Sequence, residues 1–393
     1  MNKKYEHFQK ALEKYREQKE YSQLRCVVPV DESHLNSSKE TILNFASNDF
    51  LGLSKHPHVK KNTIKYALEW GAGNTGSRLD TKHLECHWSV EEKLADLVGK
   101  ESSLLFSSAY QAQQTLLGAV GGNRSLFFID RFCQNSLIQA ATSSQAKLLR
   151  YEHQNISQLR HLLEKHKETP CKAKVIISES LFGLSGEPCN LKALINLAEE
   201  YQALLYIDDT HAIGMMGKNG MGLASHRSGI DLVTGAFGKV CGFFGAYVSL
   251  SHLMREYLLA FSPQIVETTV LPPAVLGAIS GALDLIPDMQ VERKNILHES
   301  DYLRSSLSSM GWNTREGNSH IISLFCCSES EMLEIARVLS LNNILVSHLS
   351  YPTVPKGASC LRFIINARHT REDLDTLKTI LKSLKKTPSL STI

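Results

Sequence analysis

The sequence lacks the basic runs and the long apolar runs that mark nucleic-acid-binding and membrane-spanning proteins. It holds 43 Lys and Arg against 40 Asp and Glu, a formal charge of +3, with no basic patch interleaved with aromatics. Its apolar stretches are interrupted by Lys239, or by Pro272 and Pro273, before they are long enough to span a bilayer. We therefore predict no nucleic-acid partner and no membrane span.

Cysteine is present without a pattern. The nine cysteines form no Cys-x-x-Cys pair and no Cys/His ligand spacing, so the sequence predicts reduced thiols and no metal site. Residues 1–7 are polar and lead into a charged helix, unlike a secretory signal peptide. These two features predict a cytoplasmic location.

The sequence does have short apolar runs that alternate with helical patterns. Its 393 residues, 42% of them apolar, are enough for two or three domains with a large buried interior. Continuous apolar runs separated by helices, such as 159–165 and 191–201, are typical of a buried, mainly parallel sheet covered on both faces. The runs lie at residues 103–106, 126–129, 175–177, 204–207, 232–233 and 246–248. The predicted fold class is α/β.

Three zones divide the chain. We predict an N-terminal helix and arm at residues 1–45, a large α/β domain at 46–286 and a smaller α+β domain at 287–393. A polar amphipathic helix is expected within residues 1–25, because apolar side chains recur there at helical spacing. Those side chains are Phe8, Leu12 and Tyr15.

The smaller domain is predicted to hold strands near residues 321–324 and 361–365 and to end in a helix. Thr370 followed by Asp373 is a capping box, which marks the start of that helix. An apolar stripe at helical spacing then predicts the face that packs on the core. The stripe consists of Leu374, Leu377, Leu381 and Leu384.

Lys239 is an isolated cation among small and apolar residues. Desolvation disfavours an ammonium group, so a lysine in such a segment tends toward the free amine, which condenses with carbonyl groups. An ordinary surface lysine, with its stem on apolar residues and its head in water, is the alternative.

Asp208 and His211 follow a predicted buried strand. Ligands of open α/β sheets bind outside the carboxyl ends of the strands, which is where this pair is expected. A carboxylate there can keep a pyridine nitrogen protonated, and an imidazole can hydrogen-bond a phenolic oxygen. With an imine-forming lysine, these are the groups that pyridoxal 5′-phosphate (PLP) needs as an electron sink. Taken alone, Asp208 and Asp209 also fit helix N-caps.

Six segments together resemble the α-oxoamine synthases, a family of PLP-dependent enzymes of fold type I. The resemblance extends along nearly the whole chain and implies a large domain with a mainly parallel sheet and a smaller C-terminal α+β domain. The segments, in the order of the family's motifs, are residues 43–53, 73–78, 208–211, 237–239, 268–273 and 351–355, the last followed by Arg362.

The resemblance assigns roles to individual residues. Lys239 would hold PLP as an imine and later act as the base, Asp208 would keep the ring nitrogen protonated, and His211 would contact the phenolic oxygen. Arg362 would bind the carboxylate of the amino acid, for which a planar guanidinium is suited. Further cofactor contacts would come from Ala109, Tyr110, Gln134 and Thr269, and further substrate contacts from Arg16 and Asn48. For Arg16, a solvated position on the face of the N-terminal helix is the favoured alternative.

By the same resemblance, the reaction would join an amino acid to an acyl-CoA or acyl-carrier-protein thioester with loss of carbon dioxide. The closest resemblance is to the 8-amino-7-oxononanoate synthases of biotin synthesis, which implies L-alanine and a pimeloyl thioester. Glycine C-acetyltransferase, 5-aminolevulinate synthase and serine palmitoyltransferase types remain alternatives. So does a degenerate paralogue that binds or regulates. The family also implies a homodimer, in which Thr269 reaches the phosphate of the neighbouring subunit.

The chain departs from the family at the cofactor. Gln134 stands where a histidine usually stacks on the ring, a loss of about 1 kcal/mol. Gly183 replaces a serine near the phenolic oxygen, and Ala236 replaces a phosphate-binding threonine. Smaller differences fall at Ala109 and Gln113, and Lys82 and His83 stand where a Gly-Asn pair is common. Each lost hydrogen bond, at about 0.5–1.5 kcal/mol, is expected to weaken PLP binding.

Overall fold

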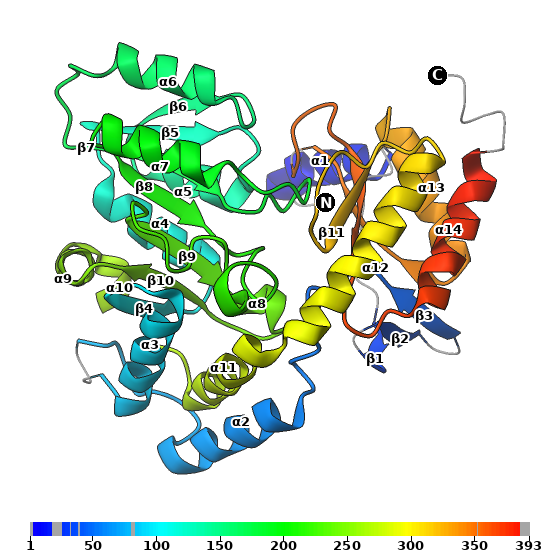
Figure 1. The fold of residues 1–393 in the computed structure, drawn as a ribbon, viewed down its shortest axis with the longest axis horizontal. Coiled ribbons are helices and arrows are strands. Elements are labelled where there is room, and N and C mark those ends of the chain that lie inside the picture. The colour runs from blue at the N-terminus through cyan, green and yellow to red at the C-terminus, as the bar shows by residue number, and fades with distance from the viewer. Residues whose placement is uncertain are drawn as a thin grey trace.

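The structure is a computed structural model that describes residues 3–17, 26–31, 33–37, 40–79, 83–351 and 353–385. It holds a seven-stranded sheet and a smaller three-stranded sheet, with the long helix α12 (Gln290–Ser309) running between them (Figure 1). A third sheet of four short strands lies beside the smaller unit. The fold is that of a mixed, mostly parallel α/β protein, as the sequence predicts.

The seven-stranded sheet has the order β4-β10-β9-β8-β7-β5-β6. Strands β5 to β9 run parallel, and β10 is antiparallel to both of its neighbours. The strands are β4 (Ser102–Phe106), β5 (Ser125–Asp130), β6 (Lys147–Tyr151), β7 (Ala173–Glu179), β8 (Leu204–Asp208), β9 (Leu232–Ala236) and β10 (Ala246–Leu250). The six apolar runs are all confirmed as strands.

Helices cover both faces of this sheet because its central strands are apolar on both sides. On β5, Phe127 and Ile129 pack with α4 (Ala109–Val120) and α5 (Asn135–Ser143), whereas Leu126 and Phe128 pack with α6 and α7. Helix α6 spans Ile156–Lys165 and α7 spans Leu191–Glu200, at the positions predicted from the sequence. The remaining helices of this part are α2 (Pro57–Trp70), α3 (Glu85–Val98), α8 (Phe237–Val240), α9 (His252–Phe261), α10 (Pro263–Val266) and α11 (Pro273–Leu285).

The smaller unit packs three helices against the sheet β11-β14-β13. The predicted capping box is present, since Thr370 N donates to Asp373 Oδ2 at 2.8 Å and Asp373 N donates to Thr370 Oγ1 at 3.2 Å. All four leucines of the predicted stripe are buried. The elements are β11 (Ile321–Phe325), α13 (Glu329–Leu341), β13 (Ser347–Leu349), β14 (Cys360–Ile364) and α14 (Arg371–Lys385), together with α12.

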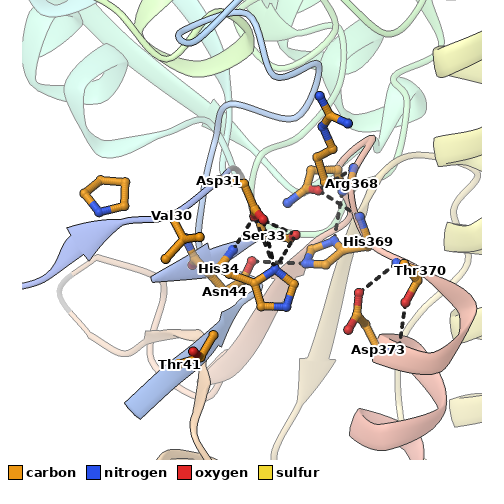
Figure 2. Close-up of polar contacts among 12 residues, drawn as sticks. Val30, Asp31, Ser33, His34, Thr41, Asn44, Arg368, His369, Thr370 and Asp373 are labelled. Carbon is orange, nitrogen blue, oxygen red and sulfur yellow. Dashed lines mark hydrogen bonds and ion pairs between the residues drawn. The ribbon is translucent and has the colours of Figure 1, made fainter. Parts of the chain in front are cut away.

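The N-terminal arm docks on the smaller unit. Strand β3 (Glu40–Asn44) pairs in parallel with β12 (Ile344–Leu345), and it also pairs with β2 (His34–Ser37), which pairs with β1 (Val28–Pro29). Figure 2 shows His369, just before α14, facing the carbonyl oxygen of Asn44, 3.1 Å from its Nε2. The His369 ring also stacks on Phe45, with the ring centroids 4.3 Å apart.

The predicted N-terminal helix is shorter in the described part of the chain. A 3-10 turn (Lys3–Tyr5) leads into α1 (Glu6–Glu17), and residues 18–25 lie outside the described residues. The three spaced side chains Phe8, Leu12 and Tyr15 are exposed. Among the described residues no single helix is long and apolar enough to cross a membrane. One pair, Pro273–Asp288 with Gln290–Ser309, passes that test together but is bent by 74°.

Candidate active site

The ends of neighbouring parallel strands bring four acidic or basic side chains together. Asp208 is the last residue of β8, and Glu179 is the last residue of β7, paired with it in register. Lys239 lies in α8, which begins directly after β9, and His211 lies in the turn after β8. Because these strands are parallel, their carboxyl ends share one edge of the sheet, and their side chains converge there.

Lys239 and His211 are in direct contact. Nζ of Lys239 lies 2.6 Å from Nε2 of His211. Burial, and then the charge of Arg362, lowers the pKa of Lys239 to about 8. Burial, and then the charge of Lys239, holds the pKa of His211 well below its usual range. His211 is therefore a neutral acceptor for Lys239, which carries a free amine over much of the alkaline range.

Asp208 accepts hydrogen bonds from three donors. Its Oδ1 accepts from the backbone N of Thr210 at 2.9 Å. Its Oδ2 accepts from Nε2 of Gln113 at 2.6 Å and from Nε2 of Gln134 at 2.9 Å. Asp208 is 1% exposed, and a buried carboxylate persists only with such partners. The site is therefore built to hold a negative charge at this strand end.

Glu179 is a second buried carboxyl group beside Asp208. Its Oε1 accepts from the backbone N of Gln134 at 2.5 Å and its Oε2 from the backbone N of Gly183 at 3.0 Å. Burial, and then repulsion by Asp208, raises the pKa of Glu179 to about 7. Glu179 is therefore partly protonated near neutral pH, because burial and the neighbouring Asp208 oppose its ionisation.

Arg362 reaches this cluster from the smaller unit. It lies on β14, and its Nη1 donates to the carbonyl oxygen of Gly183 at 3.1 Å. Burial lowers the pKa of Arg362, and its charge acts on Lys239, His211 and His320. A guanidinium group therefore lies near the amine and imidazole, within the site formed by the two units.

Ala109 and Tyr110 open helix α4, directly after β4. Ser108 caps this helix, and its side chain accepts from the backbone N of Gln111 at 3.2 Å. The first N–H groups of a helix have no partner within it, and they favour an anion such as a phosphate. The side chain of Tyr110 is half exposed, and its hydroxyl donates to Gln139 at 3.3 Å.

Thr269 lines a small hollow beside the start of α4. Arg78, Ser107 and Gln111 line the same hollow. Arg78 is paired with the buried Glu91 at 2.5 Å, so the guanidinium is fixed in the wall. The segment after α10 and the glycine-rich segment before α3 thus meet at one place, although they are far apart in the sequence.

The other predicted site residues lie outside these contacts. Arg16 is exposed near the end of α1, and Asn48 is half-buried in the segment after β3. Their roles at the substrate remain predictions. Pro352, which belongs to the last quoted segment, and Lys82, one of the departures from the family, lie outside the described residues.

The departures from the family pattern have structural counterparts. A Cβ atom at Gly183 would lie 2.1 Å from Nε2 of His211, so the imidazole fills the space of the absent side chain. Gln134 bonds Asp208 through its side chain and Glu179 through its backbone. Ala236 caps α8 without a side-chain hydrogen bond. Two of the three departures therefore add contacts within the site.

The residues present fit PLP. Within the part of the chain that the structure describes, three buried polar atoms around Asp208 and Gly183 have no hydrogen-bond partner, and a polar ligand would satisfy them. These atoms are Oε1 of Gln113, Oγ1 of Thr210 and Nε of Arg362. A carboxylate for a pyridinium nitrogen, a free amine for an aldehyde and a helix N-terminus for a phosphate lie around the same strand ends.

Sequence reasoning missed Glu179 and Gln113 as site residues. Glu179 lies two residues after the predicted run 175–177 and ends the observed strand β7, so the strand-end rule that found Asp208 could have found it too. Gln113 lies one helical turn inside α4, and its contact with Asp208 joins segments that no local pattern connects. Only the packing of α4 on the sheet brings it to the site.

Comparison with known proteins agrees with this geometry. The model of the family described as aminotransferase class I and II matches residues 40–381. A protein of Desulfosudis oleivorans named putative 8-amino-7-oxononanoate synthase is 37% identical over 366 residues, which cover 93% of this chain and 95% of that protein.

Two solved structures share the fold. A serine palmitoyltransferase from S. paucimobilis with bound PLP and myriocin superposes with a TM-score of 0.89 at 20% identity, covering 97% of each chain. An 8-amino-7-oxononanoate synthase from Francisella tularensis gives a TM-score of 0.76 at 24% identity, covering 87% of this chain and 97% of the other. At these identities the likeness establishes the fold alone.

Proposed function

The chain belongs to the aminotransferase class I and II family, and we propose that within it this protein makes 8-amino-7-oxononanoate from L-alanine and a pimeloyl thioester. That it is a PLP-dependent acyltransferase of the α-oxoamine synthase group follows from the family and the named relatives. The contact of Lys239 with His211, beside Asp208 and within the field of Arg362, is the observation that carries the proposal. The name of the relative supports the choice of substrates.

The residues that would hold PLP are those gathered at the strand ends. Asp208 would face the ring nitrogen, His211 the phenolic oxygen, and the backbone of Ala109 and Tyr110 the phosphate. When bound, the cofactor supplies an electron sink for the carbanion formed at the α-carbon of the amino acid. Each of these roles is a proposal that rests on the placement of the side chains.

Lys239 would move the proton of the reaction. Its amine is neutral above a pKa of about 8, because burial disfavours the ammonium form, so it can accept the α-proton of the amino acid. Nε2 of His211, 2.6 Å away, orients that amine. Arg362 would bind the carboxylate of the amino acid through charge-assisted hydrogen bonds and hold the α-carbon toward Lys239.

We also propose a homodimer in the cytoplasm. Ala236 offers no hydroxyl group for the phosphate, and Thr269 of the neighbouring subunit would supply one. The acyl donor, whether linked to CoA or to a carrier protein, would enter the same site. Arg16 and Asn48 are proposed as contacts for this second substrate.

The experiment mixes purified protein with PLP, L-alanine and pimeloyl-CoA, and identifies the product by mass spectrometry. We expect 8-amino-7-oxononanoate and one carbon dioxide per turnover, and no product from the Lys239→Ala variant. Parallel reactions with glycine or serine, and with acetyl, succinyl, palmitoyl or carrier-protein thioesters, test the other α-oxoamine synthase types. Protein that shows no visible aldimine absorbance, even with added PLP, would contradict an active enzyme.

One observation favours the alternative of a non-catalytic paralogue. Oδ2 of Asp208 already accepts hydrogen bonds from Nε2 of Gln113 and Nε2 of Gln134. If the side-chain amides of Gln113 and Gln134 keep these hydrogen bonds when PLP is present, the site would keep its fold without binding PLP. The titration of the protein with PLP decides between the two, because only the active enzyme binds it.

A further inference from the structure

His153 lies just outside the candidate active site, in the turn after β6. Its side chain is 14% exposed. Nδ1 lies 3.0 Å from Oδ1 of Asp130, and Nε2 lies 3.3 Å from Oε2 of Glu187. A carboxylate oxygen can only accept, so both ring nitrogens carry a proton and the ring is an imidazolium. The charge is held between two acidic groups from different segments.

The first of these segments leads to Gln134. Oδ1 of Asp130 also accepts from the backbone N of Phe132 at 2.8 Å, which shapes residues 130–134 into a turn. The ring of Phe132 stacks on His153, with centroids 4.2 Å apart and planes 13° apart. Gln134, at the end of this turn, bonds both Asp208 and Glu179. One short turn, residues 130–134, therefore connects His153 to Asp208, so the position of His153 affects the position of Gln134 at Asp208.

The second segment leads to Gly183. Residues 182–187 form a closed loop, in which Phe182 N donates to Glu187 O at 2.9 Å and Gly186 N donates to Phe182 O at 2.8 Å. The ring of Phe182 meets His153 edge-on, with centroids 4.4 Å apart. The next residue, Gly183, contacts Glu179 and Arg362 and leaves room for His211.

The same two segments form the wall against the smaller unit. Phe132 and Leu184 pack in one apolar cluster with Val354, Ala358 and Cys360, which precede Arg362 on the chain. The guanidinium of Arg315 lies over the ring of Phe132, 5.3 Å from its centroid. A shift of either segment would thus displace Gln134 or Gly183. It would also disturb the apolar cluster that packs beside Arg362.

We propose that His153 is a positioning residue, which fixes the 130–134 turn and the 182–187 loop to each other and so sets where Gln134, Gly183 and Arg362 meet the cofactor and the amino acid. The inference rests on the proposed function, because it assigns these groups to PLP and its substrate. His153 itself touches neither.

The charged groups around His153 give the proposal a pH dependence. Burial opposes the imidazolium, but the hydrogen bonds and charges of Asp130 and Glu187 outweigh it and raise the pKa of His153 to about 9. Arg315 is a cation that also acts on Glu187, and it stays charged throughout this range. Only the charged ring of His153 makes both ion pairs. The ion pairs are therefore present below the pKa of His153 and are lost as the pH rises through about 9.

The test compares PLP binding by the full-length protein and its His153→Phe variant, which keeps the ring contacts and removes both N–H groups. We expect the dissociation constant of PLP to rise about tenfold or more, the effect of losing hydrogen bonds between charged groups. The matched control is His298→Phe, where an exposed histidine next to Glu299 on α12 is removed. It should leave the constant within about twofold of the original value.

A pH profile separates positioning from a loss of stability. In the Lys239→Ala background, which removes the titration of the lysine, PLP affinity should fall as the pH rises through about 9, and the His153→Phe variant should lack that step. An unchanged PLP constant in His153→Phe, or a step that persists in it, would overturn the proposal.

If His153→Phe does not fold, Glu187→Gln supplies the same test, because it keeps the shape and removes one of the two charges. Its PLP constant should rise, and its step should move to lower pH, since the imidazolium loses one partner. If the PLP dissociation constant and the pH of the affinity step are the same with and without Glu187→Gln, the proposed role of His153 is refuted. Binding of PLP and condensation by the unaltered protein test the proposed function separately, so a failure of the role of His153 is distinguished from a failure of the proposed function.

Discussion

Gly183 and His211 share a space that holds only one side chain, because a Cβ atom at position 183 would lie 2.1 Å from Nε2 of His211. The same Nε2 lies 2.6 Å from Nζ of Lys239. The missing side chain at 183 is therefore what allows the imidazole to reach the amine.

Gly183→Ala should displace His211 and weaken PLP binding by about tenfold, the effect of one lost hydrogen bond to a charged or polar partner. Titration of the protein with PLP, followed by its visible absorbance, gives the constant. The matched control is Gly118→Ala, since a Cβ atom at Gly118 meets nothing within 4 Å. Equal constants for the two variants would show that His211 is not held by this contact.

The pKa of Lys239 predicts how fast the cofactor-free protein captures PLP. Burial lowers this pKa to about 8, and only the neutral amine attacks an aldehyde. The capture rate should therefore rise with pH and level off above about 8, which stopped-flow absorbance measures. A rate that keeps rising up to the ordinary range of a lysine, about pH 10.4, would mean that Nζ is solvated.

Gln113 should set the affinity of Asp208 for a protonated ring. It is fully buried and donates to Oδ2 at 2.6 Å. Gln113→Leu removes that donor and should weaken PLP binding about tenfold. Gln113→Glu has the same shape but places a third carboxyl group beside Asp208 and Glu179, so it should weaken binding further. Stronger binding by either variant would mean that Gln113 competes with the cofactor.

Arg362→Lys should affect the amino acid more than the cofactor. A lysine keeps the charge but loses the planar pair of donors, so KM for the amino acid should rise about tenfold to a hundredfold. The PLP constant should change little, because Arg362 bonds the loop at Gly183 rather than Asp208. Initial rates over a range of amino-acid concentrations give KM. A change in the PLP constant alone would remove Arg362 from the substrate site.

Thr269→Val tests the contribution of a second subunit. If the hydroxyl completes the phosphate site of the neighbour, this variant should bind PLP more weakly while remaining dimeric in sedimentation. Thr268→Val is the control, because it alters the adjacent residue of the same hollow. Should both variants bind PLP equally well, the phosphate would be held within one chain.

The strands that carry the site could be predicted from the sequence because they are apolar on both faces. Strand β6 was missed, since Lys147 and Arg150 break its apolar pattern at the edge of the sheet. The short strands of the N-terminal arm were missed as well. Of these, β3 pairs with a segment near residue 344, and no local pattern indicates so distant a pairing.

The site was predictable to the extent that its residues follow strands. Asp208 and Lys239 come from strand ends and a buried segment, so their neighbourhood could be inferred. The contacts of Gln113, Gly183 and His153 depend on how helices and loops pack, and they join residues without a shared motif. The sequence could identify Gly183 as a departure, but not that His211 fills its place.

The antiparallel strand β10 affects how the chain is made as well as how it is arranged. Leu105 on β4 pairs with Tyr247 on β10, and β4 is the outermost strand on that side of the sheet. During synthesis, β4 leaves the ribosome well before β10, the strand with which it pairs in the described sheet. Contacts of such sequence separation slow folding and leave strand edges open to other chains. Until residues 246–250 have left the ribosome, the edge of β4 is therefore open to pairing with other chains.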